Sequence, residues 1–351
     1  MSRIGIEELK AFCRSVLLRE GMTEADAATT AEVLVETDAF GVHSHGSKNL
    51  GGYINKAHKG GVSLHARPQI VQEGAAYAVI DACESLGMVA GTMGIQLACE
   101  KAMESGVALV TVRNSCHFGA AGYYANLAVK QGMVCLVMSN VDHNMTVPGA
   151  RGMVIGNNPV AYAAPAKSVP SVFLDIALSN VASLKVVQAR RDGREIPSTW
   201  IVDKDGLPTT DPSHYPEEGA MQPMAAHKGY GLSVFVDLMC GILSGGSTSV
   251  SGEITSWCFD PEKVNKACHT FLVVNPLLFG AGELMAERVE EMANTLRSAE
   301  KAANADRIYV PGEIEWEKHR KAEADGIELP PEVESALKEL SEASGVPLKF
   351  L

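Results

Sequence analysis

Apolar residues recur every three or four positions from residue 6 to residue 20, and this spacing predicts an amphipathic helix. Thr23 and Asp26 are spaced as in a capping box, so a second helix is expected to begin there and to run to about Asp38. Paired glycines then bracket a short helix that contains Tyr53. We therefore expect the first part of the chain to be helical.

The pattern changes in the middle of the chain, where short apolar runs alternate with helical segments. The expected elements follow one another as strand 77–81, helix 86–104, strand 107–112, helix 120–130 and strand 133–138. Later elements are expected as strands 172–178 and 270–274, helix 183–191, a β-hairpin turn at 203–206 and an apolar, buried helix at 230–243. This alternation is typical of an α/β layer fold with partly parallel strands.

Charged residues dominate the last part of the chain. Three amphipathic helices are expected there, at 283–304, at 313–325 and from Pro331 to Gly345. We predict that residues 1–70 and 300–351 pack together as one discontinuous helical domain. Residues 71–299 are then expected to form a mixed α/β domain.

Composition and charge narrow the classes of function. The net charge of −12 argues against nonspecific nucleic-acid binding, which needs a basic surface. No apolar run reaches membrane-spanning length, and charged residues interrupt the start of the chain, so neither membrane insertion nor a signal peptide is expected. The eight cysteines form no CxxC pair and are expected to be small, buried hydrophobes in the reducing cytoplasm. Cys116 stands beside His117, so a nucleophilic thiol is the alternative there.

The densest group of candidate catalytic residues is His43-Ser44-His45, which follows the second predicted helix. Histidine can change its charge near neutral pH, and a neighbouring hydroxyl can orient it. The group is therefore either a proton-transfer site or only a polar turn. Two histidines could also bind a metal ion, but no third ligand stands at a recognisable spacing, so no metal is expected.

Common cofactor and nucleophile motifs are missing. The nearest match to the GxGxxG motif of Rossmann domains lies at 280–285 and ends in Met285. That stretch is predicted to be a turn into a helix. The sequence also contains no P-loop, HExxH or GxSxG motif.

The stretch from Asp38 to Gly46 resembles a signature of the type-2 malate/L-lactate dehydrogenase family. Further matching stretches follow in the same order, at 112–119, 156–159, 163–165, 174–177, 196–212, 228–232 and 310–313. The resemblance implies a non-Rossmann fold with a mixed sheet that binds NAD or NADP, flanked by a helical domain from both chain ends. It also implies a homodimer whose active site lies near the subunit interface. The implied reaction moves a hydride between nicotinamide and a small-molecule 2-oxo or 2-hydroxy acid.

The resemblance assigns catalytic roles to four residues. His45 is expected to protonate the oxygen of the keto group as it is reduced, with Ser44 orienting His45 or binding substrate. His117 is the second candidate for the proton carrier and is also expected to contact the cofactor. Lys185 occupies a position where related sequences carry Lys or Asp near the catalytic histidine. The structural alternatives are a turn hydroxyl at Ser44 and a solvated lysine at Lys185.

Four further residues are expected to bind the substrate, namely Lys48, Asn49, Tyr53 and Asn157. Many relatives hold an arginine at the position of Asn49, where it would bind a carboxylate through two hydrogen bonds. Asparagine donates more weakly, so the pocket is expected to differ from that of an ordinary malate or lactate dehydrogenase. An imine-reducing enzyme for piperideine or pyrroline-2-carboxylate, or a noncatalytic nucleotide-binding homologue, are the alternative functions.

The cofactor is expected to contact segments at helix starts and strand ends, where free N–H groups and carboxylates are available. These residues are His117, Phe118, Gly119, Ala120, Ala121, Asp175, Ile176, Ala177, His227, Lys228, Pro311, Gly312 and Glu313. The choice between NAD and NADP stays open, because the acidic residue that marks it in Rossmann domains has no counterpart here.

Overall fold

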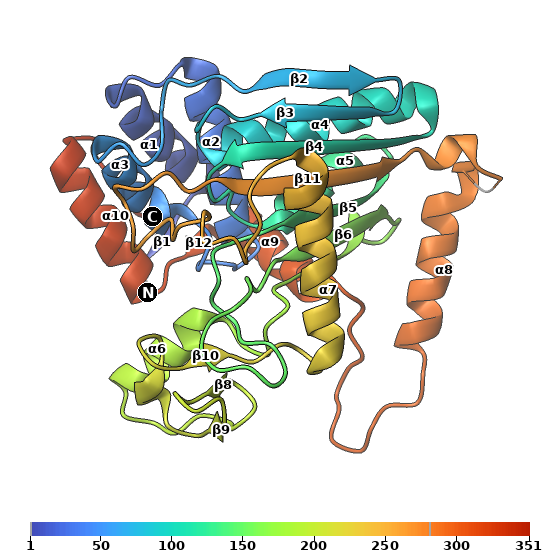
Figure 1. Cartoon of the computed structure of the whole chain (residues 1–351). Helices are drawn as coiled ribbons and strands as arrows, with labels where there is room; N and C mark the ends of the chain where they lie inside the picture. The colour runs from blue at the N-terminus through green and yellow to red at the C-terminus, as the bar shows by residue number, and fades with distance from the viewer. Residues whose placement is uncertain (1, 281) are drawn as a thin grey trace.

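A seven-stranded mixed sheet forms the centre of the computed structural model, which describes residues 2–280 and 282–351 (Figure 1). Its strands, in spatial order, are β2 (Gln69–Gly74), β3 (Tyr77–Asp81), β4 (Val107–Ser115), β11 (Ala267–Val274), β5 (Val134–Ser139), β6 (Val160–Pro165) and β7 (Ser171–Ile176). The β3–β4 pair is parallel, and the other neighbours in this sheet are antiparallel. The α/β fold with partly parallel strands is therefore confirmed.

Helices cover both faces of the sheet, and successive side chains of a strand point to opposite faces. On β11, Phe271 points toward α4 (Gly87–Ser105), where Gly94 leaves no space for a Cβ atom. The next side chain, Thr270, points the other way and donates a hydrogen bond to the Met239 carbonyl at 2.8 Å. Met239 belongs to a π-helical turn, η3 (Leu238–Ile242), that continues α7 (His227–Asp237). Helix α5 (Ala121–Val129) packs on β5 and β6.

The two ends of the chain lie together (Figure 1). Strand β1 (Arg3–Ile4) pairs with β12 (Ile327–Glu328), and α2 (Glu24–Ala39) contacts α9 (Glu313–Asp325). The remaining helices of this region are α1 (Ile6–Arg19), η1 (Ser47–Asn49), α3 (Leu50–His58) and α10 (Pro331–Ser344). The hydroxyl of Thr23 accepts from the Asp26 amide, which confirms the predicted start of α2. The proposed boundaries of the two domains stay a prediction.

A small lobe has its own apolar core around Met145, Ile155 and Val186, and it is built from the segment between β7 and α7 together with the loop between β5 and β6. It contains α6 (Ser183–Arg191), η2 (Pro212–His214), β8 (Ile201–Val202), β9 (Pro208–Thr209) and β10 (Ala220–Met221). Strands β8 and β9 are antiparallel, and the Asp203 carboxylate accepts from two amides of the turn between them. The predicted hairpin is therefore confirmed.

Helix α7 differs from its prediction. The apolar run at 230–243 predicts a buried helix, but Leu232, Phe235 and Ile242 are 48%, 43% and 61% exposed. The apolar residues are spread around the helix, and only one side of it packs against the sheet. Helix α8 (Met285–Arg297) is shorter than predicted, and its residues Val289 and Ala293 pack against β6 and β7.

Some elements and contacts have no simple sequence pattern. Strand β2 is an edge strand with mostly exposed residues, and β6 is rich in alanine, so neither shows a clear alternation. Two short 3₁₀ turns, η4 (Pro276–Leu278) and η5 (Gly282–Leu284), precede α8, and η5 lies within the partial glycine motif. Ala281 of that motif lies outside the described residues.

Candidate active site

A buried carboxylate organises the turn between α2 and α3. Asp38 accepts hydrogen bonds from the Ser47 amide at 2.8 Å and from His43 Nδ1 at 2.8 Å. Gly46 passes so close that a Cβ atom there would lie 2.0 Å from Asp38 Oδ1. His43 therefore stabilises the turn itself, and the turn fixes the backbone that carries Ser44 and His45.

Two imidazoles from different parts of the chain lie against each other. The rings of His45 and His117 are stacked with centroids 5.3 Å apart. His45 Nδ1 is hydrogen-bonded to Ser44 Oγ at 2.8 Å, and His117 Nδ1 to the Tyr53 hydroxyl at 2.6 Å. Within residues 2–280 and 282–351, neither Nε2 atom has a hydrogen-bond partner. Both are thus available to a bound molecule.

The environment keeps both rings neutral at neutral pH. Burial lowers the pKa of His45 to about 4, with a further contribution from the nearby Lys48 ammonium. Burial also holds the pKa of His117 well below its usual value, and His45 and His269 add to this effect. The pKa of the Tyr53 phenol is raised well above 10 by burial, so this group stays protonated and can donate.

The tautomer of His117 follows from its partners. The Gly119 amide can only donate, and it points at His117 Nδ1 at 3.4 Å. Nδ1 is then the unprotonated nitrogen, so the Tyr53 hydroxyl donates to it as well. The ring proton therefore sits on Nε2, which makes His117 a hydrogen-bond donor toward the space beside His45.

Lys48 and Asn49, two of the expected substrate-binding residues, lie in this turn and differ from each other in their contacts. Lys48 is half-buried and forms no ion pair with any described residue. Asn49 instead turns back and donates to the Ser44 carbonyl at 2.8 Å, which stabilises the turn. Lys48 is therefore the free cation at this site, and the Asn49 amide is already engaged.

Hydrogen bonds connect several of the segments that are expected to bind the cofactor, and this connected series is called the cofactor path. Asp175 Oδ2 accepts from the Gly122 amide at 2.7 Å, at the start of α5. Burial raises the pKa of Asp175 to about 6. Its Oδ1 atom has no partner among the described residues. Phe118 is buried, and its ring stacks on that of Tyr124 with centroids 4.6 Å apart, so its side chain belongs to the core.

Backbone hydrogen bonds connect the segment after Asp175 to the loop that precedes α7. The Leu178 amide donates to the Asn157 carbonyl at 2.7 Å, and the Met224 amide donates to the Leu178 carbonyl at 2.8 Å. The side chain of Asn157 is paired with that of Asn144. The cofactor path therefore joins Asp175, Ile176, Ala177 and Asn157 to the residues that precede His227.

The loop before α7 carries backbone strain. Ala225 and Ala226 have φ angles of 49° and 52°, a region that side chains other than glycine rarely adopt. Gly229 follows, with Met224 O only 2.2 Å from where a Cβ would stand. His227 and Lys228 are exposed at the start of the helix, and Lys228 has no ion pair within the described residues.

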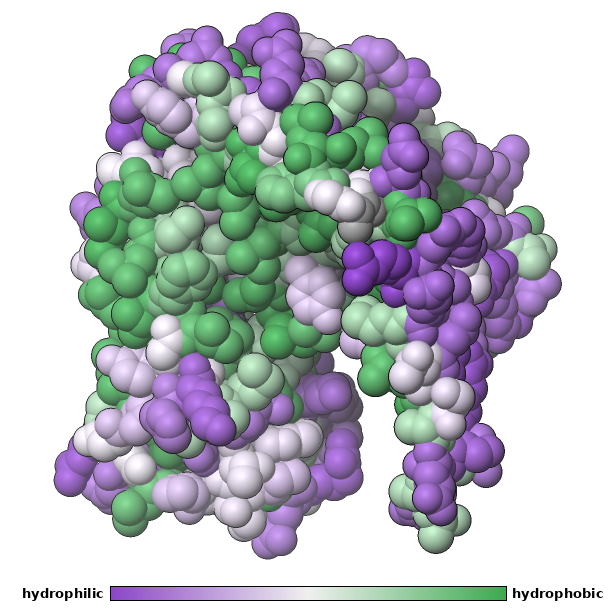
Figure 2. Space-filling model, turned by 90° about the vertical axis from the view of Figure 1, so that its right-hand side faces the viewer, coloured by the Kyte–Doolittle hydropathy of each residue, from purple (hydrophilic) through white to green (hydrophobic). Residues whose placement is uncertain are grey.

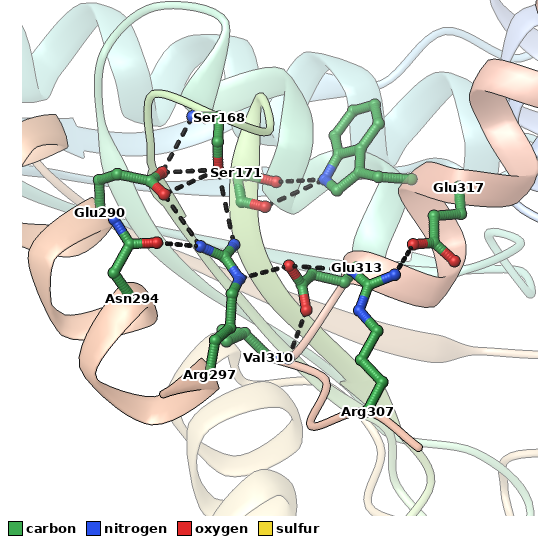
Figure 3. Close-up of polar contacts among 10 residues, drawn as sticks. Ser168, Ser171, Glu290, Asn294, Arg297, Arg307, Val310, Glu313 and Glu317 are labelled. Atoms are coloured by element: carbon green, nitrogen blue, oxygen red, sulfur yellow. Dashed lines mark hydrogen bonds and ion pairs between the residues drawn. The ribbon is translucent and has the colours of Figure 1, made fainter. Parts of the chain in front are cut away.

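Ion pairs of Glu313 hold in place the third segment that is expected to bind the cofactor, residues 311–313 (Figure 3). Glu313 accepts from Arg297 Nε at 2.7 Å and from the Val310 amide at 2.8 Å. Arg297 also binds Glu290 on α8 at 2.9 Å. Both oxygens of Glu313 are thus occupied, and the Gly312 carbonyl accepts from the Trp316 amide at 2.9 Å, which leaves the Gly312 amide as the group that could donate to a ligand. Pro311 lies beside β7, because its carbonyl accepts from the Phe173 amide at 3.2 Å.

Lys185 stands apart from the histidines in this chain. It is exposed on α6 in the small lobe, and it makes no hydrogen bond or ion pair within the described part of the chain. Cys116 is buried, and burial raises the pKa of its thiol to about 11. A thiol that stays protonated at neutral pH is a poor nucleophile, so the nucleophilic alternative for Cys116 has no support.

Other features of the site could not be recognised in the sequence. Trp257 stacks on both Tyr53 and His117, with centroids 4.7 and 5.0 Å apart. His269 is buried between the hydroxyls of Ser115 and Ser139, at 2.9 and 2.8 Å. Both lie far along the chain from the histidine motif. A lone tryptophan in a serine- and threonine-rich stretch was the only available signal.

The cysteines follow the prediction with two exceptions. All eight are free, and six are buried, whereas Cys83 and Cys258 are exposed. No group of three or more His, Cys, Asp or Glu residues is placed to hold a metal ion within the described ranges. No helix in the described part of the chain is long and apolar enough to cross a membrane.

Comparisons with known proteins find relatives over most of the chain. The family model described as malate/L-lactate dehydrogenase matches residues 4–338. A malate dehydrogenase of Pyrococcus horikoshii is 37% identical over 89% of this chain and 87% of its own. The ureidoglycolate dehydrogenase (NAD(+)) of Escherichia coli K12 is 32% identical over 91% and 90%. A Δ1-pyrroline-2-carboxylate/Δ1-piperideine-2-carboxylate reductase of Pseudomonas putida is 32% identical over 84% and 86%.

A solved structure shows the same fold. The malate dehydrogenase of Entamoeba histolytica superposes with a TM-score of 0.92 at 31% identity. The match covers 99% of this chain and 99% of that one. The mixed-sheet fold is therefore shared over the whole length of the chain.

Proposed function

The chain belongs to the malate/L-lactate dehydrogenase family, and from this membership we propose that it transfers a hydride between nicotinamide and a small 2-oxo or 2-hydroxy acid. The observation that carries the proposal is the His45–His117 pair, whose two Nε2 atoms are free of partners among the described residues and whose rings are neutral. A neutral imidazole beside a second imidazole that donates is suited to binding and deprotonating a hydroxyl group.

The residues present fit a nicotinamide dinucleotide. Asp175 offers a free carboxylate oxygen that can accept from a ribose hydroxyl, and Lys228 offers a free cation at a helix start for a phosphate. The strained Ala225–Ala226 pair lies directly before Lys228, as is common at ligand-binding loops. When bound, the cofactor supplies the hydride acceptor or donor. NAD and NADP are both candidates, and binding titrations with each would decide between them.

We propose His45 as the proton carrier. In oxidation, His45 Nε2 takes the hydroxyl proton as the carbon gives up its hydride, and in reduction the protonated ring returns it to the oxygen. His117 already carries its ring proton on Nε2, because its Nδ1 accepts from the Tyr53 hydroxyl and the Gly119 amide, so His45 is the ring that is left to accept the hydroxyl proton. His117 donates a hydrogen bond to the same substrate oxygen and is held in place by Tyr53.

Lys48 is proposed to bind the substrate carboxylate. It is the free cation near His45, and its charge contributes to the low pKa of that ring. A bound carboxylate would neutralise this charge and thereby raise the pKa of His45 toward the working range. Substrate binding would then favour the protonated form of His45, which reduction requires.

The substrate's remaining part would meet an aromatic wall. Tyr53 and Trp257 stack on each other beside His117, and the Asn49 side chain is turned away into the turn. Tyr53 is fully buried, so the half-buried ring of Trp257 forms this wall, and this ring together with the Lys48 cation favours an acid with a single carboxylate. The same wall suits a flat ring, so a cyclic imino acid is the second candidate, in keeping with the family's imine-reducing relative.

We also propose that the protein is a homodimer. Helix α7 and the turn η3 expose the apolar side chains Leu232, Phe235, Leu238, Ile242 and Leu243. Figure 2 shows a broad hydrophobic area on this face of the molecule. Exposed apolar areas of this extent are uncommon on monomers. A second copy that covers this face would shield it from water, and a change of Phe235 to Glu should then yield a monomer in sedimentation experiments.

A cytoplasmic location is part of the same proposal. Six buried free thiols suit a reducing compartment, and fractionation of the cells that produce the protein would test it.

The experiment that tests the function is a substrate panel. Oxidation of NADH and of NADPH would be followed with 2-oxo acids and with cyclic imino acids. Turnover with at least one acid is expected. Tight cofactor binding without turnover of any of them would instead favour a noncatalytic nucleotide-binding protein.

A further inference from the structure

A buried lysine lies one helical turn beyond Tyr53. Lys56 is fully buried on α3, and its Nζ donates to the carbonyls of Asp260 at 2.9 Å and Lys263 at 2.6 Å. No carboxylate of the described residues pairs with it, and burial lowers its pKa. The carboxylate of Asp260 is already paired with Lys263 at 2.8 Å. The ammonium is therefore bound only by the backbone of one loop.

That loop, residues 254–266, is closed at its base by its own hydrogen bonds. The Thr255 amide donates to the Asn265 carbonyl at 3.2 Å, and its hydroxyl donates to the Val264 carbonyl at 2.9 Å. At the far end the loop passes directly over Gly61. A Cβ atom at Gly61 would lie 2.2 Å from Pro261 O and 2.7 Å from Lys263 O.

The loop carries Trp257 to the histidine pair. The indole ring is nearly parallel to the rings of Tyr53 and His117, at interplanar angles of 24° and 21°. It also packs on α3 at Gly52, where a Cβ would be 3.3 Å away. Lys56 and Tyr53 project from the same helix, so one element holds both the loop and the partner of His117.

Burying a charge without an ion pair is costly, and a methionine of similar length would fill the same space at no such cost. The ammonium must therefore contribute something that an apolar side chain cannot. It supplies two strong, directed hydrogen bonds to the loop that carries Trp257.

We propose that Lys56 is a positioning residue that holds the 254–266 loop down and thereby fixes Trp257 against His117. The proposal rests on the proposed function for its catalytic consequence, but the position of Trp257 can be measured independently. Trp257 in turn keeps water from one face of His117 and holds the ring in the orientation in which Nε2 faces the substrate.

The test is ¹⁹F NMR of protein labelled with 5-fluorotryptophan, with the three resonances assigned through a Trp257→Phe variant. Lys56→Met should move the Trp257 resonance and increase its solvent exposure, whereas the Trp316 resonance from the core should stay in place. Lys59→Met is the matched control, because Lys59 is exposed at the end of the same helix. It should leave all three resonances unchanged.

Kinetics supply the second readout. Misplacement of a catalytic ring by about 1 Å costs roughly 10- to 100-fold in rate, so Lys56→Met should lower kcat by about this factor with little change in KM. Gly61→Ala provides a second variant, because a Cβ there would meet the Pro261 and Lys263 carbonyls and Lys56 Nζ, and would therefore separate the loop from the ammonium while the ammonium stays charged. It should reproduce the change in the Trp257 resonance, and it decides the matter if Lys56→Met does not fold.

An unchanged Trp257 resonance in the folded variants would overturn the proposal, as would a displaced Trp257 with an unchanged kcat. A wild-type protein that turns over no substrate would contradict the proposed function alone. In that case the NMR result still decides whether Lys56 holds Trp257.

Discussion

Replacing Lys48 by methionine should separate substrate binding from proton transfer. The change removes the free cation beside His45 and leaves the length of the side chain nearly the same. Two effects of opposite kind are expected. The carboxylate of the substrate loses its partner, and the pKa of His45 rises because one of the two causes that lower it is gone.

The magnitudes follow from the site. A charged hydrogen bond contributes roughly 1.5–3 kcal/mol, so KM for the acid should rise roughly 10- to 100-fold. The pKa of His45 in the wild type, about 4 instead of 6.5, corresponds to roughly 3 kcal/mol in favour of the neutral ring. Burial is the larger cause, so the pKa in the variant should rise but stay below 6.5.

The assay is the pH dependence of kcat/KM for oxidation of the hydroxy acid. Oxidation needs the neutral ring, so the rate falls as the pH drops through the pKa of His45 in the free enzyme. This acid limb should lie near pH 4 in the wild type and should move upward in the Lys48→Met variant. Lys59→Met is again the control. An unchanged KM, or an acid limb that stays in place, would refute the assignment of Lys48.

Three further predictions concern stability. Burial lowers the pKa of His269 to about 3, so between pH 6.5 and pH 3 the unfolded chain takes up a proton that the folded protein does not. The free energy of unfolding should fall by up to roughly 4–5 kcal/mol over this window, and less in His269→Gln, as urea titrations at several pH values would show. Ala226→Gly should raise the free energy of unfolding by about 1 kcal/mol, because it relieves the positive φ, and thermal unfolding would measure this. Arg297→Gln should lower it by about 3 kcal/mol in urea unfolding, because Glu313 is left buried without its main partner, whereas Arg194→Gln on the surface should have little effect.

Sequence patterns were sufficient where one period dominates an element. The strand Tyr77–Asp81 and the helices Ser183–Arg191 and Glu313–Asp325 have the predicted bounds, and the buried residues of both helices recur every three positions. Helix α7 shows the limit of this reasoning. Its sequence is mostly apolar, and hydropathy alone cannot tell a buried helix from one that leaves an apolar face uncovered.

The candidate site was only partly accessible to such reasoning. His45 and His117 could each be named as candidates, but their stacking depends on how α3, β4 and the loops around them pack. The sequence also does not predict which way a side chain points. Asn49 was expected to face the substrate, and its amide is bound to the Ser44 carbonyl instead. Trp257 and Lys56 act through a loop far along the chain, a relation that no local pattern encodes.

The central claim is that His45 carries the proton, and replacing it is the most direct test. His45→Ala should retain cofactor binding in a fluorescence titration and should lower kcat for reduction of the best 2-oxo or imino acid by about 10²- to 10⁴-fold. His43→Ala is the matched control within the same turn, and it should affect stability more than kcat, because His43 is bound to Asp38. A His45→Ala variant with full activity would contradict the account.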